Sequence, residues 1–503
     1  MLSTFREFIL KGLLVIFLIA SLLNVAIVVN AAESTSSLPA NDPSASQAPA
    51  LDYFAHLPLL YHPGNPPLGG EARWQSDLIF EKAQSANMRW LRLSVFQWDD
   101  IQPVESAPGD PPVYHWEYVQ NAALQAAAAR GFTIIATIRF APAWARKIPE
   151  YSCGPVAEAQ LDAFAEFVQT AVSIYSAPPY NIKYWEIGNE PDVDPYVASF
   201  VPNTDYDYGC WGDNSDDYYG GEYYAKMLER VYPLVKAADP ASQVLVGGLL
   251  TDCDPTYTYP PPGRDCKSSK FLEGILRYNS NQGYLYFDML SFHGYASYFR
   301  GKIFDENQVT ANPWGHRGGL VLGKADFLRQ VLSSYSADKP LLHTEGALNC
   351  PAYWTNNYSC NPQPGTDYYE AQADYVVWLY VRDWAIDIPG VIWFTVEESG
   401  WHNSGLLNPD TTTRPAHAAY RFLSQELAGA HYVGTIGNYP ELRTYAFGKT
   451  RKRIWVMWAP DQIDHTITLP ANVLVVYDKY GNPVIPSAGQ ITVNSPVYVE
   501  MWP

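Results

Sequence analysis

Positive charge is scarce in this sequence. The 503 residues include 33 lysine and arginine residues against 52 aspartate and glutamate residues, and the formal net charge at pH 7 is -19. Nucleic-acid binding depends on lysine and arginine side chains that neutralise phosphates, so we expect no nucleic acid as a partner. An internal repeat of fixed period is also missing, which argues against a solenoid or a propeller.

Cysteine is sparse, and its spacing argues against a zinc site. The six cysteines form no CxxC pair and have no HxxxH motif beside them, so we expect no bound metal. An even number of cysteines in polar segments is typical of an exported protein with disulfides. Short separations favour pairs of Cys253 with Cys266 and of Cys350 with Cys360, which leaves Cys153 for Cys210, although six cysteines allow other pairings.

The N-terminal segment predicts export. Arg6 and Lys11 precede an apolar run over residues 12–29, which is followed by small residues. This is the layout of a signal peptide over residues 1–32, although the run is also long enough for an uncleaved membrane anchor. Residues 33–50 are rich in Ser, Pro and Ala, as a disordered tether would be. We therefore expect a secreted or cell-surface protein.

The remaining sequence predicts a (β/α)8 barrel over residues 51–430 and a small β-sandwich over residues 431–503. Near-continuous apolar runs alternate with helical patterns in the first part, as in a parallel sheet buried on both faces. Short alternating strands and turn residues fill the second part. Seven runs are clear strands: 90–95, 132–138, 182–187, 244–250, 287–292, 340–345 and 390–396. An eighth strand, the first in the barrel, is expected near residues 53–60.

Two of these strands end in glutamate. Asn189 and Glu190 follow the fourth strand in IKYWEIGNEPD, and Glu345 ends the seventh strand in KPLLHTEGAL. Active sites of such barrels lie at the carboxyl ends of the strands, so these side chains are expected at one cavity. Glycoside hydrolysis needs such a pair of carboxyl groups. The chain is also 15% aromatic, and aromatic rings are suited to stacking on sugars.

The motif WEIGNEP, with HTEG on a later strand, resembles a clan of retaining (β/α)8 glycoside hydrolases. That clan includes cellulases, mannanases, β-xylosidases and β-galactosidases, and the resemblance covers most of residues 51–430. It implies that Glu190 is the general acid/base and Glu345 the nucleophile, and that Asn189 binds the sugar 2-hydroxyl. The substrate would be a carbohydrate, and no cofactor is implied.

The same resemblance extends to further residues. SFHGY offers Tyr295 to orient the nucleophile and His293 to line the cavity. Trp393 in VIWFTV would form the floor of a sugar subsite, and Trp144 in APAW a wall. A purely structural role is the alternative for the histidine and for the two tryptophans. A His at a strand end is often a hydrogen-bonded core residue, and a Trp on an apolar strand is usually part of the core.

Arg92, on the second strand, is expected to hold Glu345 ionised. The alternative is a buried structural arginine paired with Glu186, since charged residues deep in a barrel are usually paired. The acidic, aromatic segment 205–224 offers either sugar subsites or calcium ligands, although its spacing fits no EF-hand loop. Two departures from the clan are a first strand without a glycine-led opening and a long loop after the fourth strand.

These observations together predict a retaining glycoside hydrolase that cleaves β-glycosidic bonds of an oligo- or polysaccharide. Two alternatives remain open on the same fold. One is a noncatalytic glycan-binding or cell-wall interaction protein, and the other is a transglycosylase, in which a sugar resolves the covalent intermediate.

Overall fold

A computed structural model describes residues 67–149, 151–194, 208–257, 266–305, 314–350, 360 and 364–502. The expected signal peptide, the tether and the strand at residues 53–60 lie outside the described residues. Within the described part of the chain, the structure has no helix with both the length and the apolarity to span a membrane.

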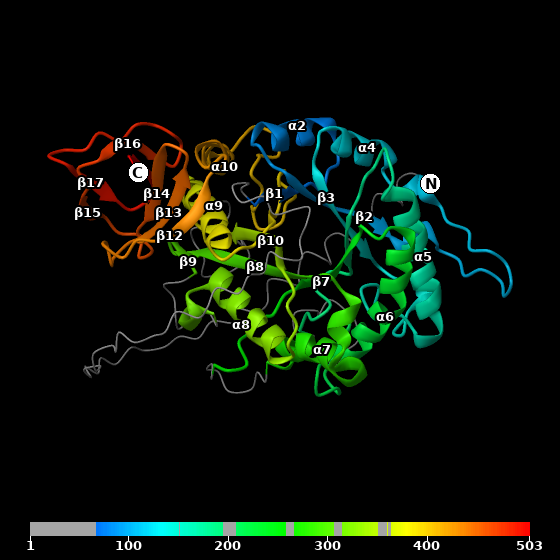
Figure 1. Cartoon of the computed structure of the whole chain (residues 1–503). Coiled ribbons are helices and arrows are strands. Elements are labelled where there is room, and N and C mark those ends of the chain that lie inside the picture. The colour runs from blue at the N-terminus through cyan, green and yellow to red at the C-terminus, as the bar shows by residue number, and fades with distance from the viewer. Residues whose placement is uncertain are drawn as a thin grey trace.

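The first part of the chain folds into a closed barrel of eight parallel strands, which confirms the predicted fold class. Pairing between β8 and β10 closes the ring (Figure 1). The barrel strands are β1 (Leu68–Glu71), β2 (Trp90–Gln97), β3 (Thr133–Arg139), β4 (Tyr184–Ile187), β7 (Gln243–Leu249), β8 (Met289–Phe299), β10 (Leu341–Asn349) and β11 (Val391–Trp393). Three short strands lie outside the ring: β5 (Tyr208–Gly209), β6 (Gly212–Asp213) and β9 (Lys302–Phe304).

The expected position of the first strand was wrong. β1 lies between β11 and β2 and has the sequence LGGE, which is too short and too glycine-rich to be recognised as a strand. The missing glycine-led opening noted above followed from this misplacement. Gly69 is required by packing, because a Cβ atom there would lie 2.6 Å from Trp90 Cβ and 2.6 Å from Ile392 Cδ1.

The barrel interior is a packed layer rather than a pore. One buried side chain from each of the other seven strands contributes to a single apolar cluster: Trp90, Ile135, Tyr184, Leu245, Met289, Leu342 and Ile392. The missing Cβ of Gly69 on β1 lets Trp90 Cβ and Ile392 Cδ1 approach the backbone closely. This apolar cluster fills the barrel interior. The polar side chains of an active site are therefore expected at the ends of the strands.

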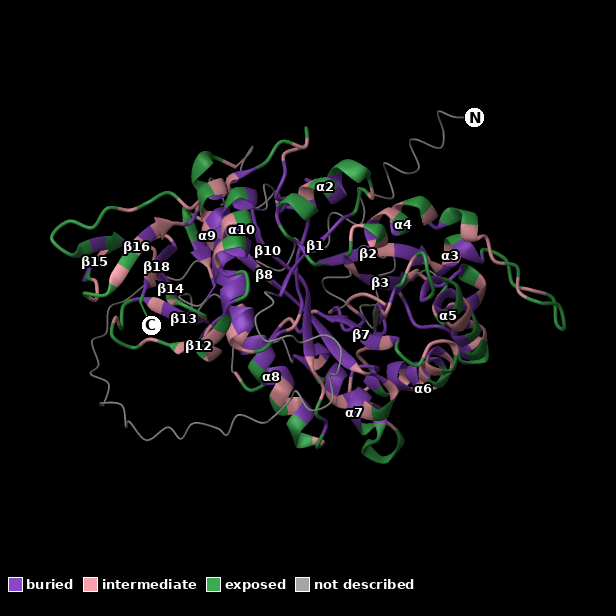
Figure 2. Ribbon diagram, turned by 45° about the horizontal axis from the view of Figure 1, so that its top comes forward, coloured by how far each residue is buried: buried purple, intermediate pink, exposed green. Residues whose placement is uncertain are grey.

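Helices surround the barrel and bury their apolar faces on it (Figure 2). They match the helical patterns of the sequence: α2 (Asp77–Ser85), α4 (Asn121–Ala129), α5 (Leu161–Tyr175), α6 (Gly221–Ala238), α7 (Phe271–Asn281), α8 (Leu320–Ser334), α9 (Thr366–Ala385) and α10 (Pro415–Glu426). A further short helix, α3 (Trp98–Ile101), directly follows β2.

The C-terminal part is a small antiparallel β-sandwich, as predicted. Its two sheets enclose a separate apolar cluster, and the sandwich lies beside α9 and α10 (Figure 1). The larger sheet contains β12 (His431–Thr435), β13 (Arg443–Lys449), β14 (Lys452–Trp458), β18 (Val497–Met501) and β16 (Val473–Asp478). The smaller pairs β15 (His465–Thr468) with β17 (Gln490–Val493). Trp378 of α9 stacks on Trp458 at 5.8 Å between ring centroids, which joins the two parts.

Three disulfides cross-link the loops at the barrel mouth. The structure pairs Cys153 with Cys210, Cys253 with Cys266, and Cys350 with Cys360, which are the pairs expected from the sequence. The first connects the loop after β3 to the loop after β4, over a separation of 57 residues. It therefore ties together two loops on one side of the barrel mouth.

Candidate active site

Arg92 of β2 is the centre of a buried ionic network. Its side chain is fully buried and donates to Glu186 Oε2 at 2.7 Å and to Glu71 Oε2 at 2.6 Å. It also donates to Glu345 Oε1, and to Asn189 Oδ1 at 2.7 Å. The sequence offered two alternatives for Arg92, a contact with Glu345 and a pairing with Glu186. The structure has both, because one guanidinium binds the two carboxylates.

Glu345 is held as a carboxylate. It lies on β10, is only 5% exposed, and accepts a hydrogen bond at Oε2 from the hydroxyl of Tyr295 on β8. Burial by itself raises the pKa of Glu345, but the charges of His293 and Arg92 and the Tyr295 hydrogen bond outweigh burial and lower the pKa to about 2. Glu345 is therefore an ionised group in a dry environment at neutral pH.

Glu190 occupies a turn that directs it toward Glu345. The turn follows β4, and Gly188 and Glu190 both have left-handed backbone angles, with φ of 84° and 47°. The Glu190 side chain is 25% exposed, and its Oε1 lies 2.9 Å from His293 Nδ1. Glu190 thus meets solvent on one side and a buried imidazole on the other.

His293 lies between the two carboxyl groups. Its Nδ1 is 3.5 Å from Glu345 Oε2, and Gly248 leaves space for the ring, because a Cβ atom there would lie 1.9 Å from His293 Nε2. Burial lowers the pKa of His293, but the nearby Glu345 and Glu190 raise it above its usual value. The ring is fully buried, so it contacts the carboxyl groups and does not line an open cavity as expected.

The two carboxyl groups are close together. One oxygen of Glu190, one of Glu345 and a ring nitrogen of His293 all lie within 4.8 Å of one another. The carboxyl groups of retaining glycosidases stand about 5–5.5 Å apart, and those of inverting ones about 6.5–9.5 Å. The same three side chains form a possible set of metal ligands. The Arg92 charge bound to Glu345 disfavours a second cation there.

The aromatic residues of the site differ from the expectation. Trp393 is fully buried and donates from Nε1 to the Ser404 carbonyl at 2.8 Å, the environment of a core tryptophan, so its role as the floor of a sugar subsite stays a prediction. Trp144 has the contacts of a core aromatic, with its ring edge-on to Trp98 at 5.2 Å. Trp401, which the sequence did not indicate, is half-buried and packs on Tyr295 of the site, with 4.7 Å between the ring centroids.

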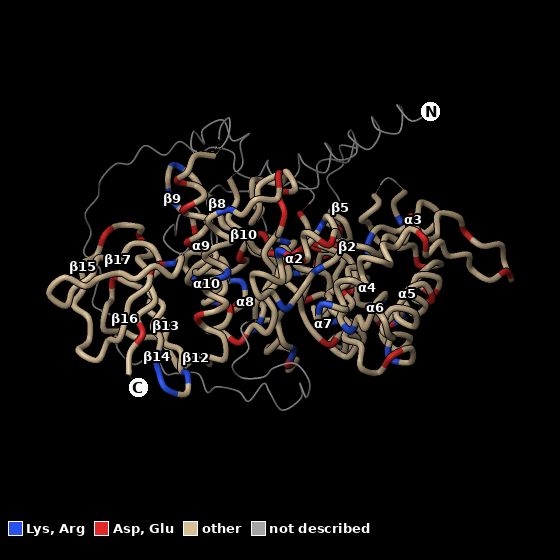
Figure 3. The backbone as a smooth tube through the Cα atoms, turned by 90° about the horizontal axis from the view of Figure 1, so that it is seen from above, with Lys and Arg blue, Asp and Glu red and all other residues tan. Residues whose placement is uncertain are grey.

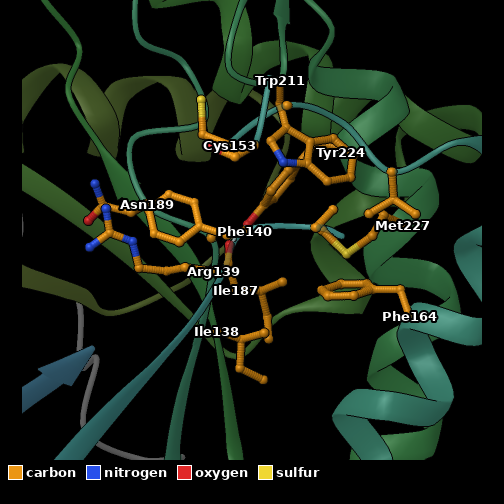
Figure 4. Close-up of a pocket in the computed structure, with 15 residues that line it drawn as sticks. Ile138, Arg139, Phe140, Cys153, Phe164, Ile187, Asn189, Trp211, Tyr224 and Met227 are labelled. Carbon is orange, nitrogen blue, oxygen red and sulfur yellow. Dashed lines mark hydrogen bonds between the residues drawn. The ribbon is translucent and has the colours of Figure 1, made fainter. Parts of the chain in front are cut away.

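A small pocket adjoins the site on the β3 and β4 side. Figure 4 shows Arg139 and Asn189 at one end of it, with Phe164 and Met227 at the other. The Cys153–Cys210 disulfide borders the same pocket. Its lining is largely apolar, and its polar end is the end next to the ionic network.

Glu71 was also missed by sequence reasoning. It lies at the end of β1, is almost fully buried, and burial raises its pKa although the adjacent Arg92 acts to lower it. Its signal in the sequence was a glutamate ending a short strand, the same signal that identified Glu345. The misplaced first strand concealed it.

Comparisons with known proteins support the fold. No family model and no curated protein matches the chain, but solved structures do. A family 39 glycoside hydrolase from Bacteroides cellulosilyticus WH2 has a TM-score of 0.62 at 18% identity, with 87% of this chain and 81% of that chain covered. A family 30 endoxylanase from Clostridium papyrosolvens C71 has a TM-score of 0.52 at 13% identity, with 88% and 98% covered.

A third neighbour is a family 51 α-L-arabinofuranosidase from Bifidobacterium longum, with a TM-score of 0.54 at 13% identity and 88% and 97% covered. At these identities the likeness establishes the fold. The chain therefore has the (β/α)8 barrel of the retaining glycoside hydrolases that its motifs resemble.

Proposed function

We propose that the protein is a retaining glycoside hydrolase that cleaves β-glycosidic bonds of an oligo- or polysaccharide. The observation that carries the proposal is the pairing of an ionised, buried Glu345 with a partly exposed Glu190 whose oxygen lies within 4.8 Å. Hydrolysis with retention requires one carboxylate that attacks and one carboxyl group that exchanges protons.

The first step uses the two groups differently. Glu345 attacks the anomeric carbon, and the bond to the leaving oxygen breaks as Glu190 donates a proton to that oxygen. Tyr295 and Arg92 hold the Glu345 carboxylate in place, one at each oxygen. In the second step Glu190 removes a proton from water, which attacks the same carbon and releases Glu345.

Asn189 is placed to bind the sugar in this scheme. Its Oδ1 accepts a hydrogen bond from the buried Arg92. This bond fixes the orientation of the whole amide group, including its nitrogen. That arrangement supports the predicted hydrogen bond from Asn189 to the sugar 2-hydroxyl. Arg92 and His293 are fully buried, so we assign them to positioning the carboxyl groups and Asn189.

The stereochemistry of the product tests the proposal. Proton NMR during hydrolysis of aryl β-glycosides should show a first-formed sugar that keeps the β configuration. An inverted first product would assign Glu345 to water activation instead. Transfer of the glycosyl group to an added sugar in preference to water would favour the transglycosylase, and absence of turnover on a broad glycoside panel would favour the noncatalytic alternative.

We also infer that the protein is exported. The three disulfides support an oxidising compartment, in keeping with the basic, apolar N-terminal sequence. Sequencing the N-terminus of exported protein should find a mature chain that begins near residue 32. An intact Met1 in a membrane fraction would show that the apolar run is an anchor.

A further inference from the structure

Arg139 is a cation without a carboxylate partner beside the candidate active site. It is the last residue of β3 and is half-buried. Its guanidinium lies 4.8 Å from the Phe140 ring centroid, and Nη1 is 3.5 Å from Ser94 Oγ, a long contact for a hydrogen bond. Its Nε is buried without an acceptor. Within the described parts of the chain, no carboxylate lies at ion-pair distance from Arg139.

The position of Arg139 links it to the reacting groups. Figure 4 shows the Arg139 head on the same side of the pocket as the Asn189 side chain. Its charge contributes to the low pKa of Glu345, so it lies within electrostatic range of the nucleophile. An anion bound to Arg139 would therefore belong to the sugar at the reacting bond or to its neighbour.

Arg73 provides a second cation in the electrostatic environment of Arg139. It follows β1 by two residues, its side chain is exposed, and its guanidinium carbon lies 5.9 Å from the Phe394 ring centroid. It too has no carboxylate at ion-pair distance among the described residues. The charges of Arg73 and Arg92 both act on Arg139. Of these three arginines, only Arg92 has carboxylates at ion-pair distance among the described residues.

Arg139 and Arg73 stand out because they lie beside the candidate catalytic groups. The chain carries an excess of acidic residues, and Figure 3 shows acidic and basic positions scattered over both of its parts. Glu345 and Glu71 attract Arg139 without an ion-pair contact, but the charges of Arg92 and Arg73 repel it and its buried Nε has no acceptor among the described residues, which costs free energy. A bound anion would remove both costs, because guanidinium groups pair with planar anions through two parallel hydrogen bonds.

Resting on the proposed glycosidase function, we propose that the substrate is an anionic glycan whose carboxylate or sulfate group binds Arg139 and Arg73. The anionic group lies on the sugar at the cleaved bond or on the adjacent one. The overall negative charge of the protein repels such a glycan at long range, but salt screens that repulsion, whereas the short-range pairing persists. Selectivity then depends on the local arginines.

Matched substrate pairs test this proposal. We would compare kcat/KM for a nitrophenyl β-glucuronide with the corresponding β-glucoside, and for a uronate-bearing xylan with its carboxyl-reduced form. A sulfated galactan and its desulfated form provide the sulfate arm. We expect the anionic member of at least one pair to be preferred by about 10-fold to 100-fold. The preferred arm then distinguishes carboxylate from sulfate.

Variants identify the residues responsible. Arg139→Met should reduce the anionic-to-neutral ratio of kcat/KM by about 10-fold or more, and Arg139→Lys should restore part of it. Arg73→Met should reduce the ratio less, because this side chain is exposed. Arg130→Met is the matched control, since Arg130 precedes β3 at the opposite end of the barrel and the variant has the same change in net charge. It should leave the ratio unchanged.

Binding separates this inference from the proposed function. Calorimetric titration of Glu345→Gln protein with the same oligosaccharide pairs measures selectivity without turnover. If wild-type protein hydrolyses none of the glycosides, the proposed function fails, yet selective binding of the anionic members that Arg139→Met abolishes would still support the arginine site. Equal or stronger use and binding of the neutral members, or a ratio that Arg139→Met leaves unchanged, would overturn the inference.

Discussion

Two of the clusters that place more than one carboxylate around a single cation differ in their burial and in the cation at their centre. At the barrel mouth Arg92 binds Glu71, Glu186 and Glu345. Where α10 meets the sandwich, Lys452 of β14 binds Glu426 at 3.0 Å and also binds Glu500 of β18. The Arg92 side chain is completely buried, whereas that of Lys452 is 26% exposed.

Burial and cation geometry explain the difference. Arg92 donates from one guanidinium to Glu186, Glu71 and Glu345, and the charges of His293 and Arg92 together depress the pKa of Glu345. Lys452 is a compact charge between two acids that hydrogen-bond each other. Burial and Glu500 raise the pKa of Glu426 to about 7, and that of Glu500 is lowered. Each cluster thus pairs a carboxyl group of raised pKa, Glu71 or Glu426, with one of lowered pKa, but only in the first cluster is the low-pKa group, Glu345, almost fully buried.

The largest expected effect comes from removing the fixed carboxylate. Glu345→Ala should reduce kcat by roughly 10,000-fold or more, because the attacking group is gone. External azide should restore turnover and give a glycosyl azide of inverted configuration. Glu500→Ala is the matched control from the second cluster and should retain activity. Near-native turnover by Glu345→Ala would refute its role as nucleophile.

Removing the proton donor should have an effect that depends on the leaving group. Glu190→Ala should slow hydrolysis of poor leaving groups by about 100-fold to 10,000-fold, because no acid protonates the departing oxygen. Dinitrophenyl glycosides need no protonation, so their first step should be nearly unaffected, and azide should yield an adduct of retained configuration. Pre-steady-state kinetics separate the two steps. An equal loss on all leaving groups would contradict the acid role.

Removing the central cation should lower the free energy of unfolding by different amounts in the two clusters. Arg92→Met leaves buried carboxylates without a counter-charge and should lower the free energy of unfolding by about 3–5 kcal/mol. Lys452→Met removes a partly exposed cation and should cost about 1 kcal/mol or less. Urea unfolding followed by tryptophan fluorescence measures both. A larger loss for Lys452→Met than for Arg92→Met would reverse the comparison.

The smallest effect is in the pH dependence of stability. The pKa of Glu426 is about 7 in the folded protein and near 4.5 when unfolded, so the folded state binds its proton more tightly. Its contribution to stability is full below pH 4.5 and is lost as pH rises toward 7. Glu426→Gln should therefore gain in Tm relative to wild type between pH 5 and 7.5. A constant Tm difference across that range would show that the pair does not share a proton.

The sequence by itself determined most of the barrel and its carboxyl pair. Apolar runs long enough to be strands identified seven of the eight barrel strands, because strands buried on both faces need continuous apolar residues. Glu190 and Glu345 were recognised because each follows such a strand. Their ordering along the chain places them at the same end of a parallel barrel, before any side-chain position is known.

Tertiary structure alone decided the first strand, the burial of the aromatic residues and the partners of the arginines. LGGE is a strand because barrel closure needs space beside Trp90, which is a property of the neighbours and not of the segment itself. Arg92 and Glu345 are separated by 253 positions, so no local pattern reveals that they meet, or that Arg139 beside them has no carboxylate among the described residues. Periodicity reports which face of an element is buried, whereas packing across the closed barrel decides which charges meet there.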